Sequence, residues 1–190
     1  MNFDSFSHGQ VQSKIWLCEK LEPWLAEESS IWVLGSWYNL TGFLLYARRP
    51  YYYKQITGYD SDPAVKPIAD SICRAWTAFN QQRIVNHTKD CNTLDWSQAP
   101  DCVINSSAEH FDSTEWWDHV PSGTLVCIQS SNVTVADEPW IIKQPNPDIN
   151  TFRNRYPLEN ELFLGVTHIR MNLEVHGVRG YDRYMIIGHK

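Results

Sequence analysis

Short apolar runs alternate with amphipathic stretches along the first 130 residues of the chain. The runs at 31–34, 55–60, 83–88, 101–105 and 124–130 are brief, contain β-branched residues and are bounded by glycine, proline or polar residues. Such runs are typical of buried β-strands. The segments 10–26, 40–49 and 62–80 carry apolar residues at helical spacing. This alternation predicts an α/β fold with a mostly parallel sheet covered by helices on both sides.

Prolines mark the expected ends of these helices. The first helix is expected to end close to Glu22, and the second before Pro50, because proline has no N–H for the helical ladder. For the third helix, Asp62 is expected to be the N-cap and Pro63 the first helical residue. These boundaries place one helix before the first strand, one after it and one after the second strand.

The pattern changes after residue 132. A proline-containing loop at 138–150 and a short helix at 151–157 lead to two apolar runs at 163–173 and 182–190. These runs predict two strands that pair antiparallel and close the edge of the sheet. Without an internal repeat or a long linker, the chain is expected to form one domain, 1–190, with a helical lead-in at 1–28.

Composition and charge narrow the classes of protein. The 190 residues are 43% hydrophobic and 20% charged, with a net charge of -6, which disfavours a nucleic-acid partner. No apolar run approaches the roughly 18 residues of a membrane span, and the N-terminus lacks signal-peptide features. The five cysteines are scattered without CxxC spacing, which predicts reduced thiols, a cytoplasmic location and no metal site.

Residues that follow the strands are the first candidates for a ligand site, because open α/β sheets bind ligands at the carboxyl ends of their strands. Gly35 follows the first strand, where a glycine lets a ligand approach the backbone closely. Asp60 ends the second strand 25 residues later and can accept hydrogen bonds from ribose hydroxyls. Asp90 follows the third strand and can bind the exocyclic amine of adenine. The alternatives are a strand-ending glycine, a turn aspartate and a solvated loop acid, respectively.

The segment "NSSAEH", from Asn105 to His110, follows the fourth strand and faces the expected reacting end of the ligand. His110 suits a general base, and Glu109 can orient it or hold a substrate amine. Alternatively, the two side chains cap the next helix or pair at the surface. Ser107 is a weaker candidate nucleophile, because no G-x-S-x-G elbow is present.

Three other side chains have a structural and a functional interpretation. Trp116 and Trp117 are expected to pack in the core, although they can also roof a ligand site. Lys14 is expected to be solvated on the first helix, with contact to a carboxylate as the alternative.

Four segments, "VLGSWYNLTG", "GYDSDP", "KDCNTLDW" and "DCVINSSAEH", resemble in order and spacing the class I S-adenosylmethionine-dependent methyltransferases. The end of the chain, "YDRYMIIGHK", is similar to their last, antiparallel strand. The nearest resemblance is to a compact phage and bacterial branch with Asn-Ser/Thr-x-x-Glu-His after the fourth strand. The resemblance implies a Rossmann-like three-layer α/β/α sandwich with a seven-stranded, mostly parallel sheet and an antiparallel last strand.

The resemblance also implies site residues. The first loop would lie beside the methionine part of S-adenosylmethionine, Asp60 at its ribose, and Asp90 with Cys91 at its adenine. The implied cofactor-binding set is Gly35, Ser36, Trp37, Tyr38, Asn39, Asp60, Ser61, Asp90, Cys91 and Asn105. The implied acceptor side comprises Asn105, Ser107, Glu109 and His110. The first loop departs from the family pattern, because bulky residues stand where most members have a second or third glycine.

Three hypotheses follow. The first is an enzyme that transfers the methyl group of S-adenosylmethionine to a small molecule or an exposed group of a larger one. The second is an enzyme that uses the same cofactor differently, for example by cleaving it. The third is a non-catalytic protein that keeps the sheet and binds a partner.

Overall fold

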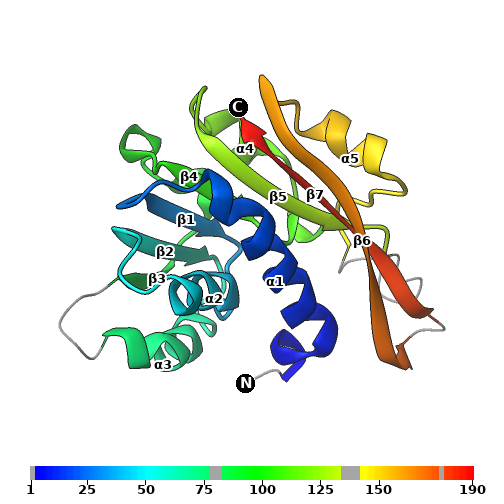
Figure 1. Cartoon of the computed structure of the whole chain (residues 1–190), viewed down its shortest axis with the longest axis horizontal. Helices are drawn as coiled ribbons and strands as arrows, with labels where there is room; N and C mark the ends of the chain where they lie inside the picture. The colour runs from blue at the N-terminus through cyan, green and yellow to red at the C-terminus, as the bar shows by residue number, and fades with distance from the viewer. Residues whose placement is uncertain (1–2, 78–82, 134–141, 176–177) are drawn as a thin grey trace.

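A computed structural model describes residues 3–77, 83–133, 142–175 and 178–190. Seven strands form one sheet in the order β3-β2-β1-β4-β5-β7-β6 (Figure 1). Their bounds are β1 Ser30–Leu34, β2 Gln55–Asp60, β3 Ile84–Thr88, β4 Cys102–Asn105, β5 Leu125–Ser131, β6 Asn160–Val175 and β7 Val178–His189. The strands from β3 to β5 pair in parallel, and β7 is antiparallel to both its neighbours. The predicted Rossmann-like sheet and its antiparallel last strand are confirmed.

Different kinds of element cover the two faces of the sheet. On one face lie the helices α1 His8–Leu21, α2 Leu40–Arg48 and α3 Lys66–Thr77, seen in front of the strands in Figure 1. The other face is covered by two short helices and by 3-10 turns: α4 Glu115–His119, α5 Ile149–Arg155, η3 Cys91–Thr93, η4 Trp96–Gln98 and η5 Ala108–His110. Two further turns, η1 Phe3–Phe6 and η2 Glu22–Trp24, flank α1. Helices on both sides are therefore confirmed, but the second layer is shorter than expected.

Alternate residues of each strand supply the two cores, because successive strand side chains point to opposite faces. In β1, Ile31 and Val33 join the core under α1–α3, whereas Leu34 joins the core on the other face. That second core also contains Trp116 and Trp117, which are 0% and 5% exposed. The core interpretation of the two tryptophans is confirmed.

The helix boundaries agree with the proline pattern except at α3. The first two helices end at Leu21 and Arg48, next to the expected positions. The third begins at Lys66, so its expected N-cap at Asp62 is wrong. Asp62 instead caps the preceding turn, where its Oδ1 accepts from the N–H of Ala64 at 2.9 Å. Residues 78–80 of the expected helix and 138–141 of the expected loop lie outside the described part of the chain.

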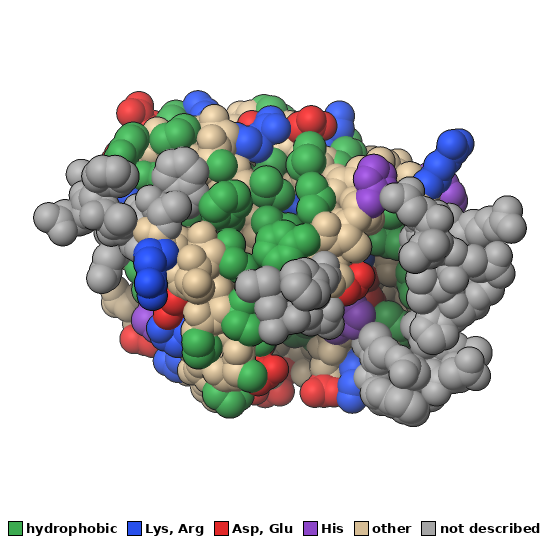
Figure 2. Space-filling model, turned by 90° about the horizontal axis from the view of Figure 1, so that it is seen from below, with side chains coloured by type: hydrophobic (Ala, Val, Ile, Leu, Met, Phe, Trp, Pro, Cys, Tyr) green, Lys and Arg blue, Asp and Glu red, His purple; other side chains and the backbone are tan. Residues whose placement is uncertain are grey.

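All five cysteines are buried and free, as the scattered pattern predicted. Among the described residues, no helix is both long and apolar enough to cross a bilayer. Lys and Arg side chains are scattered among Asp and Glu on the face in Figure 2 rather than gathered in one field.

Candidate functional site

The turn after β1 is held against the end of β2 by Asp60. Its Oδ2 accepts from the N–H of Trp37 at 2.8 Å, and its Oδ1 accepts from the N–H of Asp62 at 3.0 Å. The turn is tight, because Gly35, Trp37 and Asn39 all have positive φ, at 56°, 48° and 52°. Each carboxylate oxygen has lone pairs left for further donors. The sequence prediction that Asp60 and the first loop lie together is confirmed.

The aromatic ring of Phe111 lies directly against the backbone of Gly35. A Cβ built on this glycine would lie 2.7 Å from Cε2 of Phe111, so only glycine fits here. Ser107 adds a contact, since its hydroxyl donates to the carbonyl of Gly35 at 3.4 Å. The loop after β4 therefore sits directly on the loop after β1, and the side chain that requires the glycine is Phe111 rather than a ligand.

The side chain of Asn39 is structural, which corrects its place in the expected cofactor-binding set. It is fully buried, and its Oδ1 accepts from the N–H of Gly42 at 3.1 Å, which caps α2. Its Nδ2 donates to Oδ1 of Asn86 on β3 at 2.8 Å. Asn39 lies three residues before Gly42, the spacing of an N-cap, and this signal in the sequence pointed to its actual role.

The other residues of the first loop differ in exposure. Ser36 and Tyr38 are 8% and 6% exposed, and the N–H of Ser36 donates to the carbonyl of Tyr59 at 2.9 Å. Trp37 is half-buried, and its ring centroid lies 5.1 Å from that of Tyr38. Ser61, after β2, is exposed.

The turn that follows β3 contains a buried hydrogen-bond acceptor that has no donor. The N–H of Lys89 donates to the carbonyl of Asp60 at 2.8 Å, which ties this end to β2. Asp90 is exposed and caps η3 by accepting from the N–H of Asn92 at 2.9 Å. Cys91 is buried, and burial raises the pKa of its thiol to about 12. The Oδ1 of Asn92 is buried with no hydrogen-bond donor. Asn92 was not among the predicted site residues, although its neighbours Asp90 and Cys91 were.

The end of β4 carries a buried donor without a partner. Asn105 is 0% exposed and pairs in register with Leu34 of β1. Its Oδ1 accepts from the N–H of Ser107 at 3.1 Å, while its Nδ2 has no acceptor. Buried polar atoms are nearly always hydrogen-bonded in folded proteins, so an exception at a strand end is a candidate position for a hydrogen bond to a ligand.

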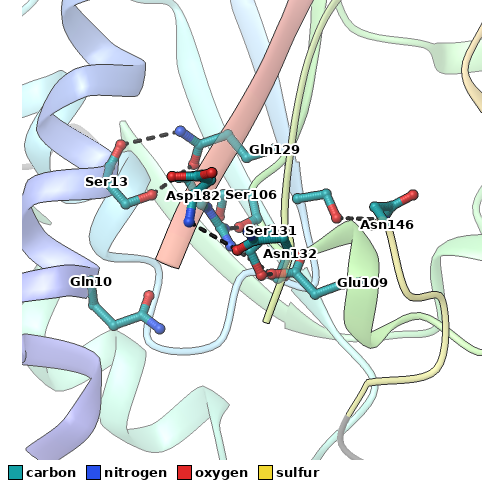
Figure 3. Close-up of polar contacts among 12 residues, drawn as sticks. Gln10, Ser13, Ser106, Glu109, Gln129, Ser131, Asn132, Asn146 and Asp182 are labelled. Atoms are coloured by element: carbon teal, nitrogen blue, oxygen red, sulfur yellow. Dashed lines mark hydrogen bonds and ion pairs between the residues drawn. The ribbon is translucent and has the colours of Figure 1, made fainter. Parts of the chain in front are cut away.

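A group of buried polar residues, which we call the polar cluster, adjoins the loop that follows Asn105. Figure 3 labels two of its members, Glu109 and Ser131. The polar cluster consists of Lys14 on α1, Glu109 on η5, Ser131 on β5 and Arg183 on β7, all 8% exposed or less. The Oε1 of Glu109 accepts from Nη1 of Arg183 at 2.6 Å and from the hydroxyl of Ser131 at 2.9 Å. Arg183 also donates to the carbonyl of Ser106, which joins the cluster to the loop after β4.

Two signals in the sequence indicated the burial of Arg183, which was not predicted as a site residue, and of Lys14, which was expected to be solvated. Arg183 precedes Met185 and Ile187 at strand spacing, and those two side chains lie in the core under α1. Lys14 precedes Leu17 and Leu21 at helical spacing, on the buried face of α1. A charged residue in the apolar stripe of a strand or a helix predicts burial, so the expectation that Lys14 is solvated is wrong.

Burial and, to a smaller extent, the charge of Arg183 lower the pKa of Lys14 to about 7, against the opposing charges of Glu109 and Asp4. Its Nζ donates to Oε1 of Gln10 at 2.6 Å. For Glu109, burial opposes ionisation, but the charges of Arg183 and His110 together with hydrogen bonds, including that from Ser131, hold the carboxyl pKa below its ordinary value. The cluster thus contains a stable anion and a lysine that gives up its proton near neutral pH.

The stability of the protein is expected to depend on pH through Lys14. Its amine keeps a proton up to about pH 10.5 when unfolded and only to about pH 7 when folded. The unfolded state therefore binds more protons across this window, and the free energy of unfolding rises with pH by up to about 1.4 kcal/mol per unit. Urea denaturation of the wild type and of Lys14→Met at several pH values checks this. Equal slopes for the two proteins would contradict it.

His110 and Glu109 are adjacent in sequence but face different surroundings. His110 is exposed, whereas the Glu109 carboxylate engages Arg183 and Ser131. The main chain of Glu109 is equally committed, because its carbonyl accepts from the N–H groups of Lys143 and Gln144 at 2.9 and 3.0 Å. Glu109 was expected to orient His110 or to hold a substrate amine. The hydrogen-bond partners of its carboxylate are Arg183 and Ser131, while the charge of His110 acts on it by lowering its pKa. His110 keeps the exposure that a proton acceptor at the protein surface requires.

A pocket of about 260 Å³ lies elsewhere, between α3 and β3, and its lining includes Asp70 and Asn86. The two side chains bond each other, with Nδ2 of Asn86 donating to Oδ1 of Asp70 at 3.0 Å. We place the candidate site at the strand ends instead, because the unpaired amide atoms of Asn92 and Asn105 lie there, beside the Asp60 carboxylate. In the described ranges, no group of three or more His, Cys, Asp or Glu side chains is arranged to hold a metal ion.

Comparison with known proteins finds similarity in structure alone. No family model and no curated protein matches the sequence. N-methyltransferase NodS from Bradyrhizobium japonicum WM9, in complex with S-adenosyl-L-homocysteine, matches with a TM-score of 0.67 and 10% identity, over 96% of this chain and 88% of that one. A protein described as a sarcosine dimethylglycine methyltransferase, from Galdieria sulphuraria, matches with a TM-score of 0.69 and 9% identity, over 95% and 86%. A geranyl diphosphate methyltransferase with its substrate and sinefungin matches with a TM-score of 0.67 and 8% identity, over 95% and 77%. The chain therefore has the seven-stranded α/β fold that these methyltransferases share.

Proposed function

We propose that the chain binds S-adenosylmethionine along the carboxyl ends of β3, β2, β1 and β4 and transfers its methyl group to an acceptor. The observation that carries this proposal is the row of polar groups in that strand order. An unpaired acceptor on Asn92 lies near β3, the Asp60 carboxylate joins β2 to the turn after β1, and an unpaired donor on Asn105 ends β4. This order matches an adenosyl group that is extended across the strand ends.

Each end of the row suits one part of the cofactor. Oδ1 of Asn92 would accept from the adenine amine, and the Asp60 carboxylate would accept from the ribose hydroxyls. Nδ2 of Asn105 would donate to the methionine part, beside the turn that begins at Gly35. Asp90 and Cys91 border the adenine side in this arrangement, and Ser61 the ribose side. The residues present therefore fit the cofactor.

When bound, S-adenosylmethionine supplies a methyl group on a positively charged sulfur, which is already activated for transfer. The protein then has to align an acceptor with that carbon and exclude water. We assign this role to the loop from Asn105 to His110. His110, which is exposed, takes the proton of an acceptor that must lose one. Ser107 and Glu109 shape the loop through their contacts with Gly35 and Arg183.

The acceptor is proposed to be a small molecule or an exposed group of a larger one. The similar structures include an N-methyltransferase with S-adenosyl-L-homocysteine and a methyltransferase that takes geranyl diphosphate. A protein of the bacterial cytoplasm or of a phage-infected cell would fit this role, in line with the Asn-Ser/Thr-x-x-Glu-His resemblance. Analysis of the products separates methyl transfer, which yields S-adenosylhomocysteine, from cleavage, which yields methylthioadenosine or a lactone.

Asp60→Ala is expected to weaken the binding of S-adenosylhomocysteine by about 1.5 to 3 kcal/mol, the scale of hydrogen bonds to a charged group. Isothermal titration calorimetry measures the loss directly. Asp118→Ala is the matched control, because it removes the same charge from an exposed position on α4. Equal affinities of the Asp60 variant and the wild type would contradict the ribose assignment. No heat for the wild type at any concentration would favour a non-catalytic binding protein.

Asn92→Ala is expected to lower the affinity for S-adenosylhomocysteine without lowering the stability of the free protein. Without cofactor, the variant loses a buried acceptor that has no partner, so the melting temperature should hold or rise. The affinity for S-adenosylhomocysteine should fall by about 0.5 to 1.5 kcal/mol, because the adenine amine loses its acceptor. Thermal melts with and without the ligand measure both effects. A lower melting temperature with unchanged affinity would assign Asn92 a purely structural role.

A further inference from the structure

We propose that the polar cluster, Lys14, Glu109, Ser131 and Arg183, is the acceptor subsite and that it takes an acceptor bearing a carboxylate or a phosphate group. This inference rests on the proposed function, because it assigns the acceptor of the same site. It is argued from the position of the cluster, its charge and its unpaired atoms.

In the strand order of the sheet, the polar cluster comes directly after the row of polar groups that is proposed to bind the cofactor. The row ends at Asn105 on β4, and the next strands are β5 and β7, which carry Ser131 and Arg183. Neighbouring strands are about 4.8 Å apart, so a molecule in the cluster lies beside the methionine end of a cofactor in the row. The contact of Arg183 with the carbonyl of Ser106 fixes this adjacency.

The cluster contains more positive than negative charge whenever Lys14 holds its proton. Arg183 and the protonated Lys14 are then its cations, and Glu109 is its anion. Buried charges require partners, and the Glu109 carboxylate, already bonded to Arg183, cannot neutralise both cations. The Nε of Arg183 is also buried without an acceptor, although the side chain is 6% exposed. An incoming anion would supply the missing charge and the missing acceptor together.

A second unpaired atom, on Glu109, adds a requirement on the molecule to be methylated. Oε2 of Glu109 is buried with no donor, next to an Oε1 that is fully used by Arg183 and Ser131. An N–H or O–H group on the same molecule would satisfy it. A small acid that carries an amine or hydroxyl, the group to be methylated, meets both conditions.

The charged and titratable groups around Lys14 come from four elements. They are Asp4 on η1, Cys18 on α1, Glu109 on η5 and Arg183 on β7. Figure 3 shows Gln10 and Ser13 of α1 on one side of this region, with Glu109 and Ser131 across from them. Gln10, half-buried, holds Nζ of Lys14, and Asp4 at the rim is exposed. Because burial and Arg183 depress the lysine pKa, an anion that binds beside it would raise that pKa and draw a proton from solution.

The test follows the protonation of Lys14 by NMR of labelled lysine side chains in the wild-type protein saturated with S-adenosylhomocysteine. Lys14 is recognised as the lysine whose side-chain signal is missing from Lys14→Met. Sodium acetate and sodium phosphate are compared with sodium chloride at equal ionic strength. We expect the Lys14 pKa to rise by about one to three units with acetate, phosphate or both. Acetamide, the neutral counterpart of acetate, should leave it unchanged, as should chloride.

Two controls make the result specific. Lys20, exposed on the same helix, should show no shift in any of these solutions. Lys14→Met should bind S-adenosylhomocysteine within about twofold of the wild type, because Lys14 lies outside the groups proposed to bind the cofactor. The difference between acetate and phosphate identifies which acid the acceptor carries.

Three outcomes would overturn the inference. One is a Lys14 pKa that is the same in acetate, phosphate and chloride. Another is an equal shift with acetamide. The third is a shift produced by S-adenosylhomocysteine alone and absent with methylthioadenosine, because the anion beside Lys14 would then be the carboxylate of the cofactor. Calorimetry with S-adenosylhomocysteine tests the proposed function separately, so failure of the acceptor subsite leaves that result intact.

Discussion

Glu109→Gln should lower the free energy of unfolding by about 3 to 5 kcal/mol, the cost of removing one partner from a buried ion pair. Glu109 is 2% exposed, and its carboxylate balances Arg183, which is 6% exposed. The variant would leave Arg183 and Lys14 buried without a compensating anion. Urea denaturation measures the loss.

A surface pair provides the control for this prediction. Glu161 and Arg153 lie at a similar distance, 2.7 Å against 2.6 Å, but their side chains are 28% and 52% exposed. Glu161→Gln should cost about 1 kcal/mol or less, because water screens the exposed pair. The double variant Glu109→Leu with Arg183→Met should recover much of the stability, since it leaves fewer buried charges unpaired. A loss of less than about 1 kcal/mol for Glu109→Gln would mean that water reaches the pair.

Gly35→Ala should destabilise the protein by about 2 to 4 kcal/mol, from two separate costs. The residue has φ of 56°, a region that alanine rarely adopts, and its new Cβ would lie 2.7 Å from the ring of Phe111. Because the ring belongs to the loop after β4, relieving the contact would also displace the loop that carries Asn105 and Ser107. The affinity for S-adenosylhomocysteine should therefore fall together with stability.

A second glycine, Gly123, provides a control that separates the conformational cost from the cost of the steric contact. It also has positive φ, 82°, but a Cβ built on it meets nothing within 4 Å. Gly123→Ala should therefore show the conformational cost alone, about 1 to 2 kcal/mol. The excess loss in Gly35→Ala reports the contact with Phe111, and Gly35→Ala combined with Phe111→Ala should remove most of that excess. Equal losses at the two glycines would show that the ring moves away freely.

The five parallel strands could be predicted from the sequence because each is a short apolar run that ends at a glycine or a polar residue. Gly35 and Asp60 were found by the same rule, since both follow directly from a strand end. The last two strands, β6 and β7, begin before the runs at 163–173 and 182–190 that predicted them. The helix layer was predicted less well where 3-10 turns replace helices, as at η3 and η4, because three-residue turns leave no periodic pattern.

The polar cluster could not be assembled from local sequence. Glu109 and Arg183 are 74 residues apart, and Lys14 comes from a third element near the start of the chain. Only the order of β5 and β7 in the sheet brings them together. Asn92 was missed for a different reason, because a polar residue inside a turn is ordinarily solvated and nothing in the sequence indicates that its amide oxygen is enclosed.

The burial of the five cysteines has a practical consequence for following how the molecule opens. Burial raises the pKa of every one of these thiols, for Cys18 and Cys73 to about 12 and about 11. Alkylating reagents attack thiolates, so the native chain offers them almost no reactive sulfur. Modification of a cysteine then reports local unfolding around that residue. The order in which the cysteines are modified therefore ranks the two cores by how often each unfolds locally.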